Sequence, residues 1–135
     1  MRIKHLNDAD MLQILSVGYR MQRVLNKEYG LPPLNAAIVN LIGSYSNKPS
    51  DEVLTLSVPE ICALLAYSTS GKEKIYYAVK DMCEGDEALL KMHTTKSTRG
   101  KKVASYSLTA RGIEIVRAAI NLTKIFRHDI AQVAV

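Results

Sequence analysis

Two short alternating segments separated by a basic loop constrain the fold of this chain more than any other feature. Residues 89–95 and 103–108 each alternate in the manner of a strand with one buried face. Only seven residues, KSTRGKK, separate them. The two segments are therefore predicted to pair as an antiparallel hairpin with KSTRGKK at its tip. The face turned to the core is predicted to carry Leu90, Met92, Thr94, Ala104, Tyr106 and Leu108.

The positive charge of the chain is concentrated around this hairpin. Between residues 88 and 113 there are six basic side chains and no acidic one, whereas the rest of the chain holds twelve basic and thirteen acidic residues. The net charge of +5 therefore belongs to this segment. Such a patch on an otherwise balanced protein is typical of binding to a polyanion, although the same charges would also keep an exposed hairpin solvated. The six are Lys91, Lys96, Arg99, Lys101, Lys102 and Arg111.

The size and composition indicate one soluble domain over residues 1–135, with an aliphatic core because the chain has one Phe and no Trp. Cys62 and Cys83 match neither a disulfide framework nor a zinc site, which favours a reducing, cytoplasmic compartment. The first residues lack the apolar region of a signal peptide, and no apolar run reaches the roughly 18 residues that span a bilayer. No membrane association is expected.

Helical periodicity predicts three longer helices. The first covers residues 8–29 and stops at Gly30, and the second runs from Pro33 to about residue 45. The last covers residues 110–128, where Thr109 can cap its first turn. The apolar stripe of this last helix is predicted to consist of Ile113, Val116, Ala119 or Ile120, Thr123 and Phe126.

Two shorter helices are predicted between the loop at residues 46–52 and the hairpin. A strand candidate at residues 53–56 is followed by SVPE at 57–60, a capping-box pattern that opens a helix over residues 58–66. Ser70 and Glu73 repeat that spacing and are predicted to open a second helix that runs to about residue 84. Two such helices joined by a tight turn form a helix-turn-helix. The buried face of the second is predicted to carry Ile75, Ala78, Val79 and Met82.

This order of elements, with LSVPEICALLAYSTSGKEKIYYAVKDMCEGDEALLKM followed by a basic hairpin and YSLTARG, resembles the winged helix-turn-helix of the MarR and SarA regulators. The most specific match is Leu108-Thr109-x-x-Gly112, which is similar to the family's junction between wing and final helix. The resemblance covers most of the chain. It implies a mainly α fold with a small β-hairpin wing, with the helix-turn-helix at 57–84, the wing at 89–108, and long helices at 7–30 and 110–130 that form a dimer.

The resemblance further implies a cytoplasmic, homodimeric transcriptional regulator that binds double-stranded DNA and has no enzymatic activity, metal or cofactor. The second helix of the helix-turn-helix would enter the major groove, and the wing would lie on the backbone or in the minor groove. That helix has no Arg, Asn or Gln, so specificity is expected to be modest or based on DNA shape. The candidate DNA-binding residues are Thr69, Ser70, Lys72, Lys74, Tyr76, Tyr77, Lys80, Lys96, Thr98, Arg99, Lys101 and Lys102.

Two details of these candidates stay open at the level of sequence. Tyr76 and Tyr77 are neighbours, and only one of them can readily point to the groove while the other packs toward the flank. At the tip, Gly100 and Lys101 follow Arg99 where the family has an acid that orients its wing arginine. The role of the wing arginine is therefore carried over to Arg99, with Lys101 and Lys102 as competitors for it.

Other functions fit the sequence less well. A plasmid or phage partition protein that binds centromere repeats, or a winged-helix adaptor that binds another protein, would show a similar pattern. Catalysis has little support, because His5, His93 and His128 lie on unrelated segments and are expected at the surface. Cys62 is expected in the core, and redox sensing by either cysteine is not favoured. The presence of a small-molecule effector is left open.

Overall fold

The chain folds into two compact units. In the computed structural model, which describes residues 7–46, 55–96 and 99–133, one unit consists of residues 34–116 and is called the winged unit below. The other, the helical unit, consists of residues 1–33 and 117–135. This division separates most of the two long helices predicted to dimerise from the predicted helix-turn-helix and wing. The expectation of one domain over residues 1–135 stays a prediction.

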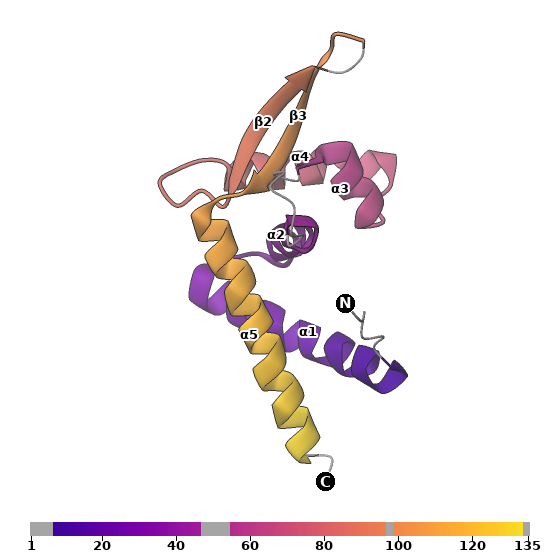
Figure 1. Ribbon diagram of the computed structural model, residues 1–135, viewed down its shortest axis with the longest axis vertical. Coiled ribbons are helices and arrows are strands. Elements are labelled where there is room, and N and C mark those ends of the chain that lie inside the picture. Colours follow the sequence, from indigo (N-terminus) through magenta and orange to yellow (C-terminus); the bar gives the residue numbers. More distant parts are fainter. Residues whose placement is uncertain (1–6, 47–54, 97–98, 134–135) are drawn as a thin grey trace, which may run out of the picture. The chain divides into compact units, whose positions relative to one another are not determined.

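Two long helices cross in the helical unit (Figure 1). Helix α1, Asp8–Tyr29, begins where the Asp10 N–H donates to the side chain of Asn7 (2.8 Å), and it ends at Gly30, whose φ of 63° is left-handed. Helix α5, Ala110–Val133, contributes its residues from 117 onward. The helix at residues 8–29 and its stop at Gly30 are confirmed.

Polar contacts join these two helices. Arg127 pairs with Asp10 at 2.6 Å, and Arg20 pairs with Asp129 at 3.4 Å. The Arg20 guanidinium also lies over the ring of Phe126, 4.1 Å from its centroid. The side of α1 that carries Asp10 therefore packs against α5.

The core of the winged unit is aliphatic, as predicted. Helix α2, Pro33–Ser46, buries Ile38, Val39 and Ile42 completely, and it begins and ends close to the predicted positions. Helix α3, Val58–Leu64, contributes Ile61. Helix α4, Lys72–Met82, contributes Ile75, Val79 and Met82 from one face, in agreement with the predicted stripe, and Ala78 is half-buried beside them.

The first predicted capping box is confirmed and the second is wrong. The Ser57 N–H donates to Glu60 Oε1 at 3.1 Å, and the Glu60 N–H donates back to Ser57 Oγ at 3.4 Å. Ser70, in contrast, lies inside a 3₁₀ turn, Thr69–Gly71, so its backbone continues toward the helix and α4 is capped by Gly71 without a side-chain hydrogen bond. The Ser70 hydroxyl is instead 2.7 Å from that of Ser68.

Both short helices end earlier than predicted. Helix α3 stops at Leu64 because Ala66, with a φ of 59°, has left the helical region. Helix α4 stops at Met82, and Gly85 follows with a φ of 85° in the loop that leads to the hairpin.

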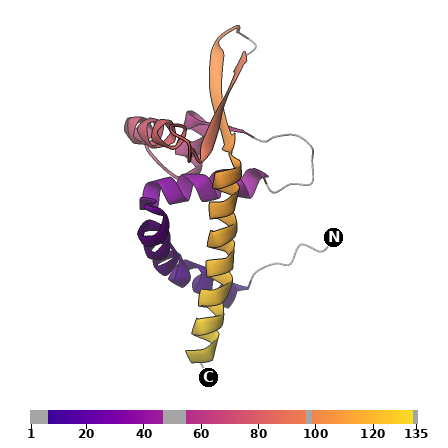
Figure 2. The same ribbon diagram turned by 90° about the vertical axis from the view of Figure 1, so that its left-hand side faces the viewer.

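Three antiparallel strands form a sheet in the order β1-β3-β2. Strand β1 is Leu56–Ser57, and β2, Leu90–Lys96, pairs with β3, Lys102–Leu108, from Leu90↔Leu108 to Lys96↔Lys102. The predicted strand at 53–56 is confirmed at Leu56 and wrong at Thr55, and residues 53 and 54 lie outside the described residues. The hairpin extends beyond α3 and α4 in two perpendicular views (Figures 1 and 2).

The predicted inner face of the hairpin is buried only at its base. Leu90 and Tyr106 are buried, whereas Met92 is 56% exposed and Thr94 is exposed. Met92 and Tyr106 are register partners, so they lie on the same face. The outer half of the wing projects past the core, and a pattern of alternation alone does not reveal where the core ends.

The junction between wing and final helix explains the motif Leu108-Thr109-x-x-Gly112. The Thr109 hydroxyl donates to the carbonyl of Ala88 (2.6 Å), and the Gly112 N–H donates to Thr109 Oγ1 (3.1 Å), which confirms the predicted cap. The Thr109 N–H donates to the carbonyl of Leu89 at 3.0 Å. A Cβ on Gly112 would collide with that same carbonyl oxygen. Threonine and glycine are therefore both required by local geometry.

The predicted stripe of α5 is confirmed except at its start. Ala119 and Phe126 are buried and Val116 and Thr123 are half-buried, whereas Ile113 is exposed. Ile115 is buried instead, since it follows Gly112 by three residues on the face that meets the Leu89 carbonyl. The helix also continues to Val133, beyond the predicted end at residue 128.

Replacing Gly112 with alanine is expected to destabilise the fold by about 1 to 3 kcal/mol, because the new methyl group forces the start of α5 away from the Leu89 carbonyl. Urea unfolding followed by circular dichroism measures the change. The matched control is Gly18→Ala in α1, where a Cβ meets nothing within 4 Å. That variant should gain up to about 1 kcal/mol. Equal stability of both variants would contradict the close approach.

Candidate nucleic-acid interface

Helix α4 presents all of its charged side chains on the side away from the core. Lys72, Lys74 and Lys80 are exposed, while Ile75 and Val79 on the opposite side are completely buried. Because the buried positions fix the rotation of the helix, these lysines cannot point into the core and extend into solvent. The three predicted lysines thus lie on one accessible helix together with Tyr76 and Tyr77.

The two adjacent tyrosines have different surroundings. Their rings meet edge to face with centroids 5.6 Å apart. Burial raises the pKa of the Tyr106 phenol in β3, with smaller contributions from Cys83 and Tyr76, which places Tyr76 close to the wing. Tyr77 is 58% exposed and points away from the core. Of the two alternatives left open by the sequence, Tyr76 therefore takes the flank and Tyr77 the outward face.

The N-terminus of α4 offers backbone donors. Gly71 caps the helix without a side chain, so its first N–H groups receive no side-chain hydrogen bond from the cap. Such a terminus can bind an anion such as a phosphate oxygen. Ser70 is exposed beside it, with its hydroxyl next to that of Ser68. Thr69 belongs to the same turn by its backbone, and its side chain lies outside the described part of the structure.

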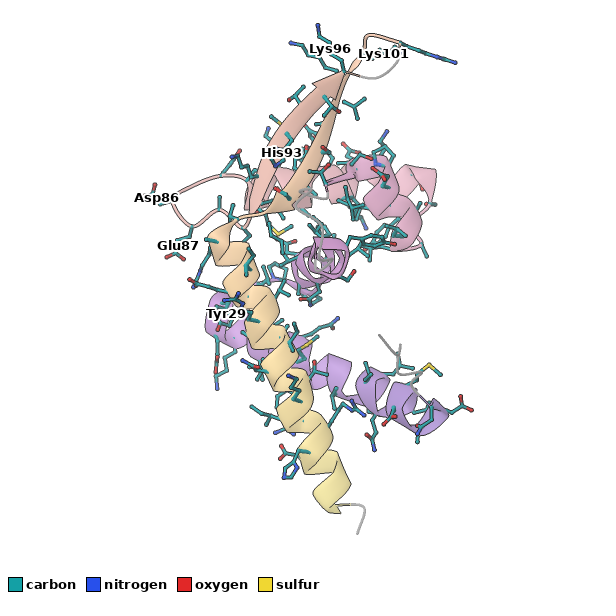
Figure 3. All side chains as sticks on the ribbon, viewed as in Figure 1. Tyr29, Asp86, Glu87, His93, Lys96 and Lys101 are labelled. Carbon is teal, nitrogen blue, oxygen red and sulfur yellow. The ribbon has the colours of Figure 1, made fainter. Side chains whose placement is uncertain are left out.

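The tip of the hairpin collects four exposed basic residues, Lys96, Arg99, Lys101 and Lys102. Gly100 turns the chain there with a φ of 75°. Lys96 and Lys101 lie at one end of the hairpin, and the nearest acidic residues along the chain, Asp86 and Glu87, lie at the other end (Figure 3). The tip is therefore positive without neutralising neighbours in its own hairpin. Thr98, the remaining predicted wing residue, falls outside the described residues.

Arg111 does not belong to this patch. Its guanidinium pairs with Glu114 at 2.8 Å and with Glu87 at 3.7 Å, which holds it at the base of the wing. The six basic residues counted in this segment of the sequence therefore separate into five on the strands and tip and one that is part of the junction with α5. A count of charges does not show this difference, because Glu114 reaches Arg111 through the helix and Glu87 is brought to it by the fold.

His93 is not the surface residue that the sequence suggested. It is half-buried on β2, and its Nε2 lies 2.7 Å from Oγ of Ser107 on β3. This hydrogen bond joins the two strands of the wing. His128 is exposed, and His5 lies outside the described residues.

Within the described ranges, no three His, Cys, Asp or Glu side chains come together in a way that could hold a metal ion. In the same ranges, no helix combines the length and the apolar character needed to cross a membrane.

Three solved structures are similar to this chain over most of its length. MepR, a transcription regulator of the Staphylococcus aureus multidrug efflux pump MepA, has 9% sequence identity and a TM-score of 0.61, with 94% of this chain and 84% of that chain covered. The S. aureus MepR–DNA complex has 15% identity and a TM-score of 0.54 over 97% and 83%. The transcriptional regulator BldR from Sulfolobus solfataricus has 12% identity and a TM-score of 0.58 over 94% and 86%.

These similarities show the fold. The chain has the fold of these structures, mainly helical with a small antiparallel sheet, as the sequence predicted. No protein-family model matches the sequence, and no curated protein matches it either. The agreement therefore lies in the arrangement of elements and hardly at all in residue identity.

The two cysteines differ in burial. Cys62 is buried in α3, as predicted. Burial raises the pKa of the Cys83 thiol, and the negative charge of Glu84 raises it further. A raised pKa lowers the thiolate fraction at neutral pH, and the thiolate is the reactive form.

Cys83 is expected to react slowly with iodoacetamide at neutral pH in the folded protein, and faster as the pH rises above the ordinary thiol pKa. Peptide mapping by mass spectrometry follows the reaction at this residue, with the urea-unfolded chain as reference. Glu84→Gln removes the negative charge, which is the smaller of the two causes of the raised pKa of Cys83, and should accelerate the reaction slightly. Alkylation of folded and unfolded chains at the same rate would contradict the assignment.

Proposed function

We propose that this protein is a homodimeric transcriptional regulator that binds double-stranded DNA. The observation that carries the proposal is the basic hairpin tip, which has no acidic residue beside it in the hairpin. The same unit contains α4, which buries its apolar face in the core and exposes its lysines. The similarity to the fold of the MepR–DNA complex supports it. A cytoplasmic location and the absence of enzymatic activity are part of the proposal.

In the proposed complex α4 enters the major groove and the wing follows the backbone. Lys72 and Lys74 neutralise phosphates on the groove rims, and the N–H groups of the first turn of α4 bind one more phosphate oxygen. Lys96, Lys101 and Lys102 contact the backbone beside the groove. Arg99, at the turn of the hairpin, reaches the adjacent minor groove, where a narrow groove attracts a guanidinium.

The dimer is supported by an apolar stripe on α1 that faces away from α5. Leu12, Leu15 and Tyr19 are 64%, 74% and 70% exposed. They recur at helical spacing on the side opposite Asp10, Val17 and Leu25, so they form a second apolar face on a helix whose first face is already used. A stripe of this kind is typical of a protein–protein interface. A twofold dimer would place two copies of α4 on successive half-sites.

Binding to duplex DNA is expected to weaken steeply with salt. Replacing Lys101 and Lys102 with alanine should reduce the slope of log affinity against log salt by about 1.8, because each phosphate contact contributes about 0.9. Fluorescence anisotropy with a random duplex at several salt concentrations measures the slope. The matched control, Lys27→Ala with Lys124→Ala, removes the same charge from exposed positions of the helical unit and should leave the slope nearly unchanged.

The same titration separates this proposal from its competitors. An adaptor that binds another protein would show no DNA binding even at low salt. A partition protein would bind DNA, but selection from random or genomic DNA would recover tandem repeats instead of a pair of inverted half-sites.

Sedimentation is expected to show a dimer at micromolar concentration. Leu15→Glu places a charge in the middle of the α1 stripe and should yield a folded monomer. Met92→Glu is the control, since Met92 is also exposed and apolar but lies on the wing. A monomeric wild-type protein, or a Leu15→Glu variant that is still dimeric, would exclude α1 as the interface.

A further inference from the structure

An acidic side chain stands in the middle of the surface assigned to DNA. Glu73 lies in the first turn of α4 and is exposed. Tyr77 and Lys80 follow it at spacings of four and seven, so these three residues form one stripe along the helix. The buried residues Ile75, Val79 and Met82 lie on the opposite side. Glu73 therefore points directly away from the core.

The fold gives Glu73 no partner. Within the described part of the chain it makes no hydrogen bond or ion pair, although Lys72 and Lys74 are its immediate neighbours. Adjacent residues on a helix point in different directions, so these lysines lie at the two sides of the stripe. The exposed surface of α4 is thus positive at its edges and negative along its midline near the N-terminus.

This pattern matches the chemistry of a major groove. Phosphates line the two rims, and the edges of the bases form the floor. An unpaired carboxylate directed at phosphates would only weaken binding. Directed at the floor, it accepts a hydrogen bond from an exocyclic amino group, and N4 of cytosine is the donor that Glu typically contacts. In helix-turn-helix proteins, the residues near the N-terminus of the recognition helix are those that contact base edges.

We infer that Glu73 is the specificity-determining residue of α4 and selects a cytosine at one position of each half-site. This inference rests on the proposed DNA binding and adds to it the base that is recognised. It also narrows the expectation of modest or shape-based specificity, because a carboxylate can contact a base edge on a helix that has no Arg, Asn or Gln. Tyr77, one turn further along the stripe, would contact the neighbouring base pair.

A purely structural role predicts a different outcome. A carboxylate in the first turn stabilises a helix by interacting with its dipole. Loss of that interaction would lower thermal stability and leave base preference unchanged. Base preference is therefore the decisive measurement, and stability is recorded in parallel.

The experiment is selection of bound fragments from random duplex DNA with the wild type and three variants. The wild type should prefer cytosine at one position per half-site by about tenfold over other bases. Glu73→Ala should lose that preference and bind random DNA more tightly, because a negative charge is removed. Glu73→Gln should transfer the preference to adenine, since glutamine bonds N6 and N7 of that base. Asp81→Asn removes an equal charge near the other end of α4 and should keep the wild-type motif.

Each result has a definite meaning. If the Glu73→Ala and Glu73→Gln variants select the wild-type motif, Glu73 does not read a base and the inference is wrong, while the proposed DNA binding stands. A preference that is lost at a position other than cytosine overturns the assignment of the base. If the wild type binds no duplex even at low salt, the proposed function itself fails. Retention of the cytosine preference by Asp81→Asn, together with its loss in both Glu73 variants, supports the inference.

Discussion

The backbone of Leu89 is the point on which the geometry of the winged unit depends. Its N–H donates to the carbonyl of Met82, the last residue of α4, at 2.8 Å. Its carbonyl accepts the N–H of Thr109 at 3.0 Å and faces Gly112 at the start of α5. One residue thus ties the end of the candidate recognition helix to both strands of the wing and to the final helix.

The parts of the fold that the sequence predicted well are those determined within a few residues. The SVPE capping box and the pairing of two alternating strands across one short loop are of this kind. The Thr-x-x-Gly junction combines a local cap, from Thr109 to Gly112, with contacts to Ala88 and Leu89. Where a prediction was wrong, the backbone followed a constraint that lies outside the sequence pattern. Ser70 had the right spacing for a cap, but the 3₁₀ turn placed it inside the helical path. At the start of α5, Ile115 is buried instead of Ile113 because Gly112 packs against Leu89, a contact between residues far apart in sequence that the apolar stripe could not reveal.

At the candidate site, the sequence likewise shows which charged residues are present but not where the fold places them. Composition located the excess positive charge, but only the fold separates Arg111, held by Glu87 and Glu114, from the exposed residues of the hairpin tip. Likewise, the sequence presents Lys72, Glu73 and Lys74 as three alternating charges, whereas the rotation of α4 assigns the lysines to the edges and the glutamate to the midline. The division between Tyr76 and Tyr77 follows from the same rotation, which turns Tyr77 away from the buried face. Which side chain lies on which face of α4 is thus decided by how the helix packs against the core.

The hairpin also acts as an electric dipole. Asp86 and Glu87 lie at its base, and Lys96 and Lys101 lie at its far end (Figure 3). In the field of a polyanion such a rod experiences a torque that turns its positive end forward before any contact is made. The torque acts only within the Debye length, about 8 Å at physiological ionic strength. Ionic strength would then influence the orientation in which the protein arrives as well as how tightly it is held, so productive encounters become a larger fraction of all collisions as salt falls.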